Sequence, residues 1–150
     1  MKSMRITVIG IVVALAACGQ QSAAPATAPS AEYTLEQAGD SIPLAMGKMV
    51  RVGGNLFQLT DVPGDSRCPR EAVCVWAGDA IAAIAIHPGC LPAGCAAPSY
   101  LMSLHTGLEP RSGTNGGYRV TLLSLQPVPS AGKPTDRSAY VAWVRITSTS

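Results

Sequence analysis

The stretch YRVTLLSL at residues 118–125 decides the fold of this chain. Its first half alternates, which places Tyr118, Val120 and Leu122 on one face, the pattern of a half-buried β-strand. After Leu122 the apolar positions shift by one residue, and Leu123 and Leu125 continue the apolar face. One extra residue in a β-bulge restores such a pattern, so we predict a bulge at Leu122–Leu123.

A second stretch, YVAWVRI at residues 140–146, predicts another strand. Apolar residues occupy both of its faces until Arg145, which indicates a strand that is mostly covered. Short β-like runs separated by glycine, proline and asparagine recur along the rest of the chain. The predicted strands cover residues 42–46, 48–53, 55–62, 78–87, 99–105, 117–127 and 138–148.

These runs predict an all-β fold in one domain over residues 32–150. About seven short strands are typical of a single antiparallel β-sandwich of immunoglobulin-like size, and a small β-barrel is the alternative. Residues 32–40 are compatible with a short turn of helix. Twelve prolines, fifteen glycines and one phenylalanine among 150 residues argue against a helical bundle.

The N-terminus has the parts of a bacterial export signal. Two cations come first, residues 6–15 are apolar but too short to span a bilayer, and LAAC follows at residues 15–18. This end resembles a bacterial lipobox. The resemblance implies that residues 1–17 are a lipoprotein signal peptide, that Cys18 is lipidated, and that Gly19 permits passage to the outer membrane. A conventional signal peptide with a chance cysteine is the alternative.

Residues 18–31 are uncharged and rich in alanine and proline, which predicts a lipidated, flexible tether. Loss of the signal peptide removes two of the 11 cations and none of the nine acids, so the mature chain carries nine of each. A neutral chain has no basic field that would attract nucleic acid. We therefore expect membrane attachment through the acyl chains on Cys18 and no nucleic-acid partner.

Four cysteines remain beyond the lipidation site: Cys68, Cys74, Cys90 and Cys95. An even number in an exported chain predicts disulfide bonds, and four cysteines allow three connectivities. Local pairing of Cys68 with Cys74 and of Cys90 with Cys95 is favoured, because each pair brackets a proline-containing connection. Zinc and thioredoxin-type redox sites are the alternatives, but one spacing is wide for zinc and no C-x-x-C occurs.

The most unusual stretch is DSRCPREAVCVWAGDA at residues 65–80. It resembles a D-S-R-C-P-x5-C-V/I-W-A-G-x-A signature of uncharacterised bacterial secreted proteins and lipoproteins. The resemblance extends loosely to the following strand and to the hairpin at residues 118–129. It implies a fold and a compartment but brings no biochemical activity.

Two interpretations of this stretch are open. In the structural one, a disulfide locks an extended loop, Trp76 plugs one end of the sandwich and Gly78 permits close backbone passage. Asp65 then caps backbone amides or pairs with Arg67. In the functional one, a rigid, charged loop presents a partner-binding surface. Its charged residues are Asp65, Arg67, Arg70 and Glu71.

His87 and His105 each end a predicted strand, so the pair would approach and bind a metal if these strands were neighbours. Three methionines lie in strand-like runs, and thioether and imidazole ligands together suit copper, so copper is the natural metal for such a site. Methionines in strands are, however, more often core residues. A hydrolase triad of Ser103, His105 and Asp79 can be assembled on paper, but no G-x-S-x-G elbow accompanies it. We predict no catalytic residue and do not expect an enzyme.

These features predict a lipid-anchored protein of the bacterial outer membrane, facing the periplasm or the cell surface. Its expected role is structural or the binding of an envelope protein or component, without catalysis or cofactor. A periplasmic inhibitor of a lysozyme-type hydrolase is the first alternative, although residues 138–140 do not match the S-G-x-x-Y-type loop of lysozyme-inhibitor lipoproteins. A copper-binding envelope protein is the second.

Overall fold

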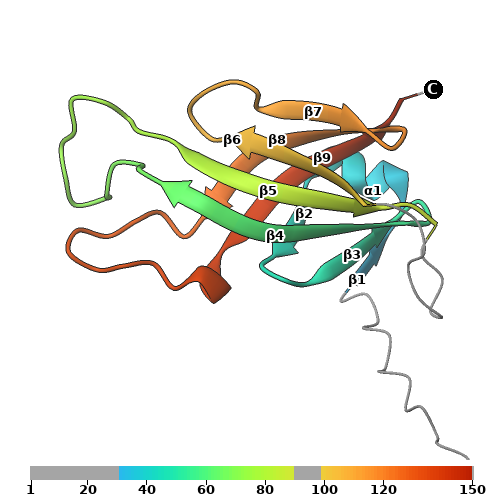
Figure 1. Cartoon of the computed structure of the whole chain (residues 1–150), viewed down its shortest axis with the longest axis horizontal. Coiled ribbons are helices and arrows are strands. Elements are labelled where there is room, and N and C mark those ends of the chain that lie inside the picture. The colour runs from blue at the N-terminus through green and yellow to red at the C-terminus, as the bar shows by residue number, and fades with distance from the viewer. Residues whose placement is uncertain (1–30, 90–98, 150) are drawn as a thin grey trace, which may run out of the picture.

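The computed structural model describes residues 31–89 and 99–149, which form two facing β-sheets (Figure 1). One sheet has the strand order β1-β3-β4-β5-β6, and the other has the order β2-β9-β8-β7. The described elements are β1 (Ala31–Tyr33), α1 (Leu35–Asp40), β2 (Ile42–Ala45), β3 (Met49–Val52), β4 (Asn55–Asp65), β5 (Ala80–His87), β6 (Tyr100–His105), β7 (Ser112–Asn115), β8 (Tyr118–Gln126), the 3-10 turn η1 (Arg137–Ala139) and β9 (Val141–Ser148).

This architecture confirms the predicted all-β sandwich, because the two sheets are open at their edges and do not close into a barrel. The seven predicted strands are present as β2 to β6, β8 and β9. The sequence does not predict β1 and β7, since β1 has three residues and β7 reads SGTN, without apolar alternation. Strand β1 pairs in parallel with β3, which departs from the purely antiparallel prediction.

Strand β8 carries the predicted bulge. Leu122 lies opposite Val144 of β9, but the next paired residue, Ser124, lies opposite Trp143, so Leu123 is the extra residue. The bulge keeps Leu122 and Leu125 inside, each 1% exposed. The break in the sequence alternation is therefore a break in register.

Strand β9 differs from its prediction on one face. Ala142, Val144 and Ile146 are fully buried, as expected for the inner face, whereas Trp143 between them is 37% exposed. The sheet has one partner layer, so the outer face of β9 meets solvent although it lies between β2 and β8. The prediction of a mostly covered strand therefore fails on this outer face, because the sequence does not distinguish Val141 and Trp143 from core residues.

The core fills the space between the two sheets with apolar side chains from both. Phe57 of β4 meets Tyr118 of β8 edge to face, with ring centroids 5.4 Å apart. On β5, Ala82, Ile84 and Ile86 are fully buried, which places their small and branched side chains against the opposite sheet.

Helix α1 lies within the helical turn predicted at residues 32–40, although Glu32 and Tyr33 belong to β1. It begins with a capping box, in which the Thr34 hydroxyl accepts the Gln37 N–H at 3.3 Å and the Gln37 amide oxygen accepts the Thr34 N–H at 3.0 Å. Ala38 is its buried residue. In the part of the chain that the structure describes, no helix is long and apolar enough to cross a bilayer.

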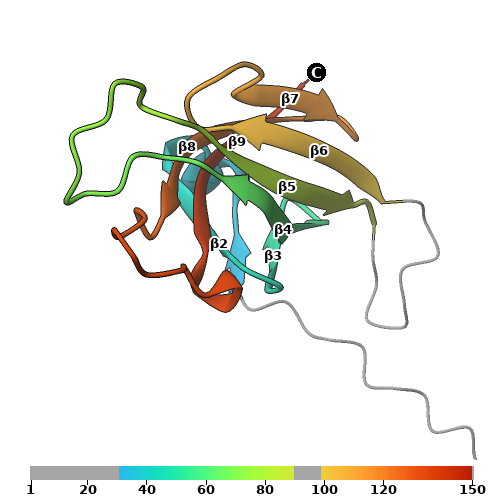
Figure 2. The ribbon, with the colours of Figure 1, turned by 60° about the vertical axis from the view of Figure 1, so that its left-hand side comes forward.

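Two long connections lie at one end of the sandwich (Figures 1 and 2). They are residues 66–79 between β4 and β5, named the stapled loop from here on, and residues 127–140 between β8 and β9. The described chain starts away from this end. Ala31 pairs with Val50 of β3, and Val50 pairs with Phe57 of β4, so Ala31 lies level with Phe57. From Phe57, β4 continues to Asp65, about 25 Å further along the strand. The stapled loop therefore projects from an end remote from the start of β1.

Candidate functional site

The stapled loop is an ordered extension of the β4–β5 hairpin. Ser66 N–H donates to the Asp79 carbonyl at 2.7 Å, and Cys68 N–H donates to the Ala77 carbonyl at 3.0 Å. The predicted disulfide between Cys68 and Cys74 is present, with the two Cα atoms 5.9 Å apart. In the chain-entropy model, closing so short a loop contributes about 2 kcal/mol by restricting the unfolded chain. The loop thus has a fixed path at its base and in its middle.

A network centred on Arg67 fixes the loop to both sheets. The Asp65 carboxylate accepts hydrogen bonds from Nε of Arg67 at 2.8 Å, from its Nη2 at 2.6 Å and from its backbone N–H at 3.2 Å. Both roles predicted for Asp65, capping and pairing, are therefore present. The Tyr140 hydroxyl donates to the same carboxylate at 2.9 Å. The guanidinium also donates to the carbonyls of Leu125 and Pro127.

This network is largely shielded from solvent. The side chains of Arg67 and Asp65 are only 12% and 9% exposed. Burial raises the pKa of Asp65, but the hydrogen bonds from Arg67 and Tyr140 outweigh burial and hold that pKa below its ordinary value. Asp65 and Arg67 therefore belong to the support of the loop and contribute little to a partner-binding surface.

The other two charged candidates have different positions. Glu71 accepts the Ala131 N–H at 3.0 Å, and this bond lowers the pKa of the Glu71 carboxyl. Arg70 donates its backbone N–H to the Pro129 carbonyl at 3.1 Å, while its side chain is exposed. Glu71 thus ties the stapled loop to the β8–β9 connection, and the Arg70 charge lies at the surface.

The outward side of the stapled loop is apolar. Val73, Val75 and Trp76 are 104%, 92% and 82% exposed, and they are named the apolar tip from here on. The prediction that Trp76 plugs the end of the sandwich is wrong. Arg67 and Tyr140 occupy that end, and the base of the stapled loop keeps the Trp76 ring outside.

Asp79, at the end of the stapled loop, organises the connection that follows β6. Its Oδ2 lies 2.6 Å from Nδ1 of His105, and its Oδ1 accepts the N–H of Gly107 at 2.8 Å and of Leu108 at 3.3 Å. Leu108 is 60% exposed and lines a shallow hollow of about 340 Å³ together with Trp76. The apolar surface thus extends from the apolar tip to Leu108.

The Asp79–His105 pair is the part of the hydrolase triad that the structure brings together. Ser103 precedes His105 by two residues on β6, and among the described residues its hydroxyl makes no hydrogen bond to the imidazole. The pair depends on the β5–β6 register, in which Ile81 lies opposite His105, and local sequence carries no signal for that register. The arrangement fixes the orientation of the imidazole and the turn beyond it.

Replacing Asp79 with asparagine is expected to change the pH dependence of folding. Burial raises the pKa of Asp79, but hydrogen bonds from Gly107 and His105 outweigh burial and lower it from 3.8 to about 2. A lowered folded-state pKa gives stability that is present above about pH 4 and lost as the pH falls toward 2. We expect wild type to exceed Asp79→Asn by about 2 kcal/mol at pH 7, with the difference shrinking between pH 4 and 2. Urea unfolding from pH 2 to 7 measures it, and a difference independent of pH would contradict the assignment.

The two histidines do not form a common metal site. His105 lies opposite Ile81 at one end of the β5–β6 ladder, whereas His87 ends β5 six residues later, about 20 Å away. Nδ1 of His87 lies 2.7 Å from the Ser99 hydroxyl. Residues 31–89 and 99–149 contain no cluster of three or more potential metal ligands among histidine, cysteine and acidic residues. Met46 and Met102 pack against the core. The two histidines therefore do not come together as the copper hypothesis required.

Other predicted features lie outside the described residues. These are the signal peptide at residues 1–17, the lipidation site Cys18 with nearly all of the tether, and the Cys90–Cys95 pair. Ala31, the last residue of the predicted tether, is the first residue of β1.

Comparisons with protein-family models, curated proteins and solved structures find no match to this chain.

Proposed function

We propose that this chain is a lipid-anchored protein of the bacterial envelope that binds a protein partner through its stapled loop, without catalysis. The observation that carries the proposal is the apolar tip, three apolar side chains at least 82% exposed on a loop of fixed conformation. Single exposed apolar residues are common on protein surfaces, but a contiguous group is typical of an interaction site.

The fixed conformation of the stapled loop favours binding. The disulfide, the base hydrogen bonds and the Arg67 network restrict the loop before any partner arrives. Association then loses less conformational entropy than it would with a mobile loop. Tryptophan is also among the residues that most often dominate the binding energy at interfaces. Trp76 on this support is therefore the expected centre of the contact.

The position and charge of the loop support a protein partner over a lipid surface. The loop projects from the end of the sandwich remote from the start of β1, which is where the predicted tether joins. Residues 65–79 contain Arg67 and Arg70 against Asp65, Glu71 and Asp79, so this region carries no excess of cations for anionic lipid. A convex, apolar and nearly neutral loop fits a concave apolar site on another protein.

A hydrolase is one class of partner with such a site. Active-site clefts are concave, and a protruding rigid loop has the complementary shape. Dose-dependent inhibition of a lysozyme-type enzyme by the wild-type chain, lost in Trp76→Ala, would place the partner in this class. Arg67 is a poor position for testing inhibition by charge reversal because it supports the loop internally.

Replacing Trp76 with alanine is expected to weaken partner binding by about 30-fold, the effect of removing one dominant interface residue. A photo-crosslinking amino acid at Val75 of the full-length lipidated chain identifies the partner, and affinity for that partner is then measured. Trp143→Ala is the matched control, because Trp143 is a partly exposed tryptophan on the outer face of β9 and not on the stapled loop. We expect that control to remain within twofold of wild type.

Two results would contradict this proposal. One is an equal loss of affinity in Trp76→Ala and Trp143→Ala. The other is insertion of the loop into lipid, which Trp143→Phe can detect because it leaves Trp76 as the single tryptophan. A blue shift of Trp76 fluorescence on vesicles of neutral or anionic phospholipid, without any protein partner, would assign the apolar tip to membrane binding.

A further inference from the structure

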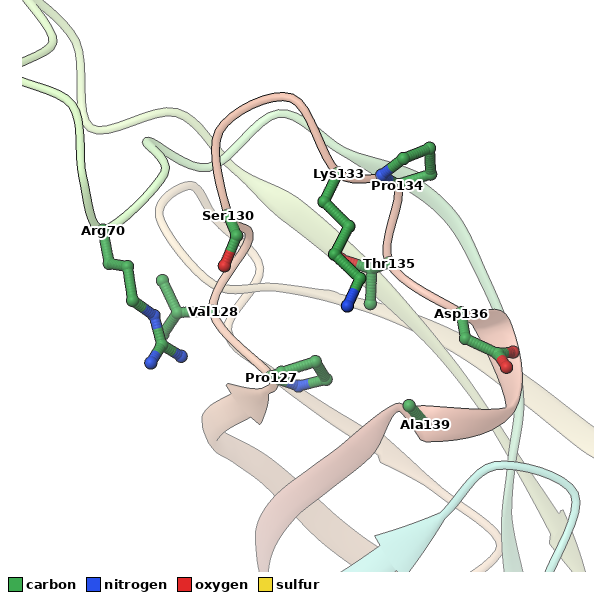
Figure 3. A pocket seen from close by; sticks show the side chains of 9 residues that line it. All are labelled: Arg70, Pro127, Val128, Ser130, Lys133, Pro134, Thr135, Asp136 and Ala139. Carbon is green, nitrogen blue, oxygen red and sulfur yellow. The ribbon is translucent and has the colours of Figure 1, made fainter.

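A hollow of about 330 Å³ is lined by residues of the β8–β9 connection, with Arg70 of the stapled loop at its edge (Figure 3). Its floor and sides include Pro127, Val128 and Pro134, and it adjoins the loop that carries the apolar tip. Its volume is within the range of sites that hold small molecules or short peptide segments. It shares no lining residue with the shallow hollow beside Trp76 and Leu108.

Two cations border this hollow from different sides. Lys133 extends its ammonium toward the middle of the hollow, and the Arg70 guanidinium lies beyond Val128 on the other side (Figure 3). Within residues 31–89 and 99–149, the ion pairs involve Arg67, His105 and Arg137, and neither Arg70 nor Lys133 takes part in one. Both charges are therefore available to a ligand.

The nearby acids are engaged with other groups. Asp136 accepts hydrogen bonds from the Ser138 N–H at 2.9 Å and hydroxyl at 2.8 Å, and its carboxylate points away from the hollow in Figure 3. Glu71 accepts the Ala131 N–H, which is the main cause of its lowered pKa, and the Arg70 charge contributes less. These carboxylates help to shape the hollow without neutralising its two cations through ion pairs.

The hollow is formed before any ligand arrives. The bonds from Arg70 N–H to Pro129 and from Ala131 N–H to Glu71 hold the stapled loop against the connection that lines the hollow. Proline has a restricted backbone, so Pro127 and Pro134 limit the motion of the lining. Pro127 and Val128 thus form an apolar surface between the two cations, and Ser130 and Thr135 add polar groups to the lining (Figure 3).

We propose that this hollow binds an acidic peptide segment, with one carboxylate at Arg70, a second at Lys133 and the intervening residue over Pro127 and Val128. The inference rests on the proposed function and specifies the chemistry of the protein partner: an acidic segment beside the apolar site that receives Trp76. Two separated cations suit two carboxylates, whereas a single phosphate is best held by donors that converge on one point.

The test uses a probe peptide, acetyl-Glu-Ala-Glu-amide, and its uncharged analogue acetyl-Gln-Ala-Gln-amide. Each is titrated by calorimetry into the full chain in neutral detergent micelles. We expect saturable binding of the acidic peptide, about tenfold weaker in Arg70→Gln and in Lys133→Gln, and no measurable binding of the analogue. Lys48→Gln, which removes an exposed cation from the β2–β3 turn, is the matched control and is expected to bind as wild type.

Any of three results would overturn the inference: equal binding of the two peptides, no loss of affinity in Lys133→Gln, or tighter binding of inorganic phosphate than of the acidic peptide. The proposed function is tested separately by Trp76→Ala. If partner binding depends on Trp76 while the acidic peptide does not bind, the proposed function stands and the acidic-peptide inference fails.

Discussion

Arg67→Met is expected to lower the free energy of unfolding by about 3–4 kcal/mol, measured by urea denaturation at pH 7. The substitution keeps much of the aliphatic side chain and removes the charge. It leaves the Asp65 carboxylate, 9% exposed, without its cation, and it removes the donor from the carbonyls of Leu125 and Pro127. Breaking a buried ion pair costs about 3–5 kcal/mol, chiefly because the remaining charge stays buried.

Arg137→Met is the matched control for that result. Arg137 pairs with Asp61, but their side chains are 69% and 42% exposed, so solvent screens the interaction. Exposed ion pairs contribute about 0–1 kcal/mol. Adding Asp65→Asn to Arg67→Met should recover part of the loss, because it removes the stranded charge. An equal loss of unfolding free energy in the two arginine variants would show that Arg67 contributes no more to stability than an exposed arginine does.

The sequence predicts part of this network and omits the rest for a physical reason. Asp65 and Arg67 are two residues apart, so their pairing and the capping role of Asp65 follow from local geometry. The carbonyls of Leu125 and Pro127 are 58 and 60 residues from Arg67 and reach it only through the packing of the two sheets. The local pair was therefore predictable, and the connection between sheets was not.

Alternation of apolar residues predicts the larger strands and the β8 bulge, because burial of one face imposes a period of two. It fails for β7, whose glycine and polar residues are held by pairing with β8. It also misplaces the outer face of β9, since Trp143 has the same apolar character whether it packs in a core or borders solvent. Strand existence is thus encoded locally, whereas coverage of each face depends on how many layers form.

The candidate site likewise combines features that the local sequence predicts with features that depend on the whole fold. The Cys68–Cys74 bond and the close passage at Gly78 follow from short spacing and residue type. The structural interpretation of the sequence places Trp76 inside, because large aromatic residues are mostly buried. Its outward direction depends on the base of the stapled loop. The predicted approach of the two histidines required the ends of neighbouring strands to meet. The β5–β6 register instead places His105 opposite Ile81, near the start of β5, whereas His87 is the last residue of β5.

Gly78→Ala is expected to lower the free energy of unfolding by about 3 kcal/mol. Gly78 has φ +71°, and a Cβ there would lie 1.9 Å from the Ser66 carbonyl oxygen. The left-handed conformation costs an alanine about 1 kcal/mol, and backbone movement away from Ser66 breaks or weakens about two base hydrogen bonds at about 1 kcal/mol each. Urea denaturation measures the loss, and amide exchange should quicken at Ser66 and Cys68.

Gly47→Ala separates the two causes of that loss. Gly47 has φ +72°, nearly the same as Gly78, but a Cβ there meets no atom within 4 Å. It should therefore cost about 1 kcal/mol, the conformational part alone. Equal losses at the two glycines would mean that the chain relieves the contact with Ser66 at no cost, and that the base of the stapled loop is not tightly packed.

Gly78→Ala also tests whether the conformation of the stapled loop matters for binding. It leaves Val73, Val75, Trp76 and the Cys68–Cys74 bond in the chain but displaces the backbone that carries them. If binding needs a fixed loop, affinity for the crosslinked partner should fall at least tenfold at a temperature where the variant is still folded, and Gly47→Ala should retain wild-type affinity. Retained affinity in Gly78→Ala would mean that exposed apolar residues suffice and that the support built around Arg67 serves folding alone.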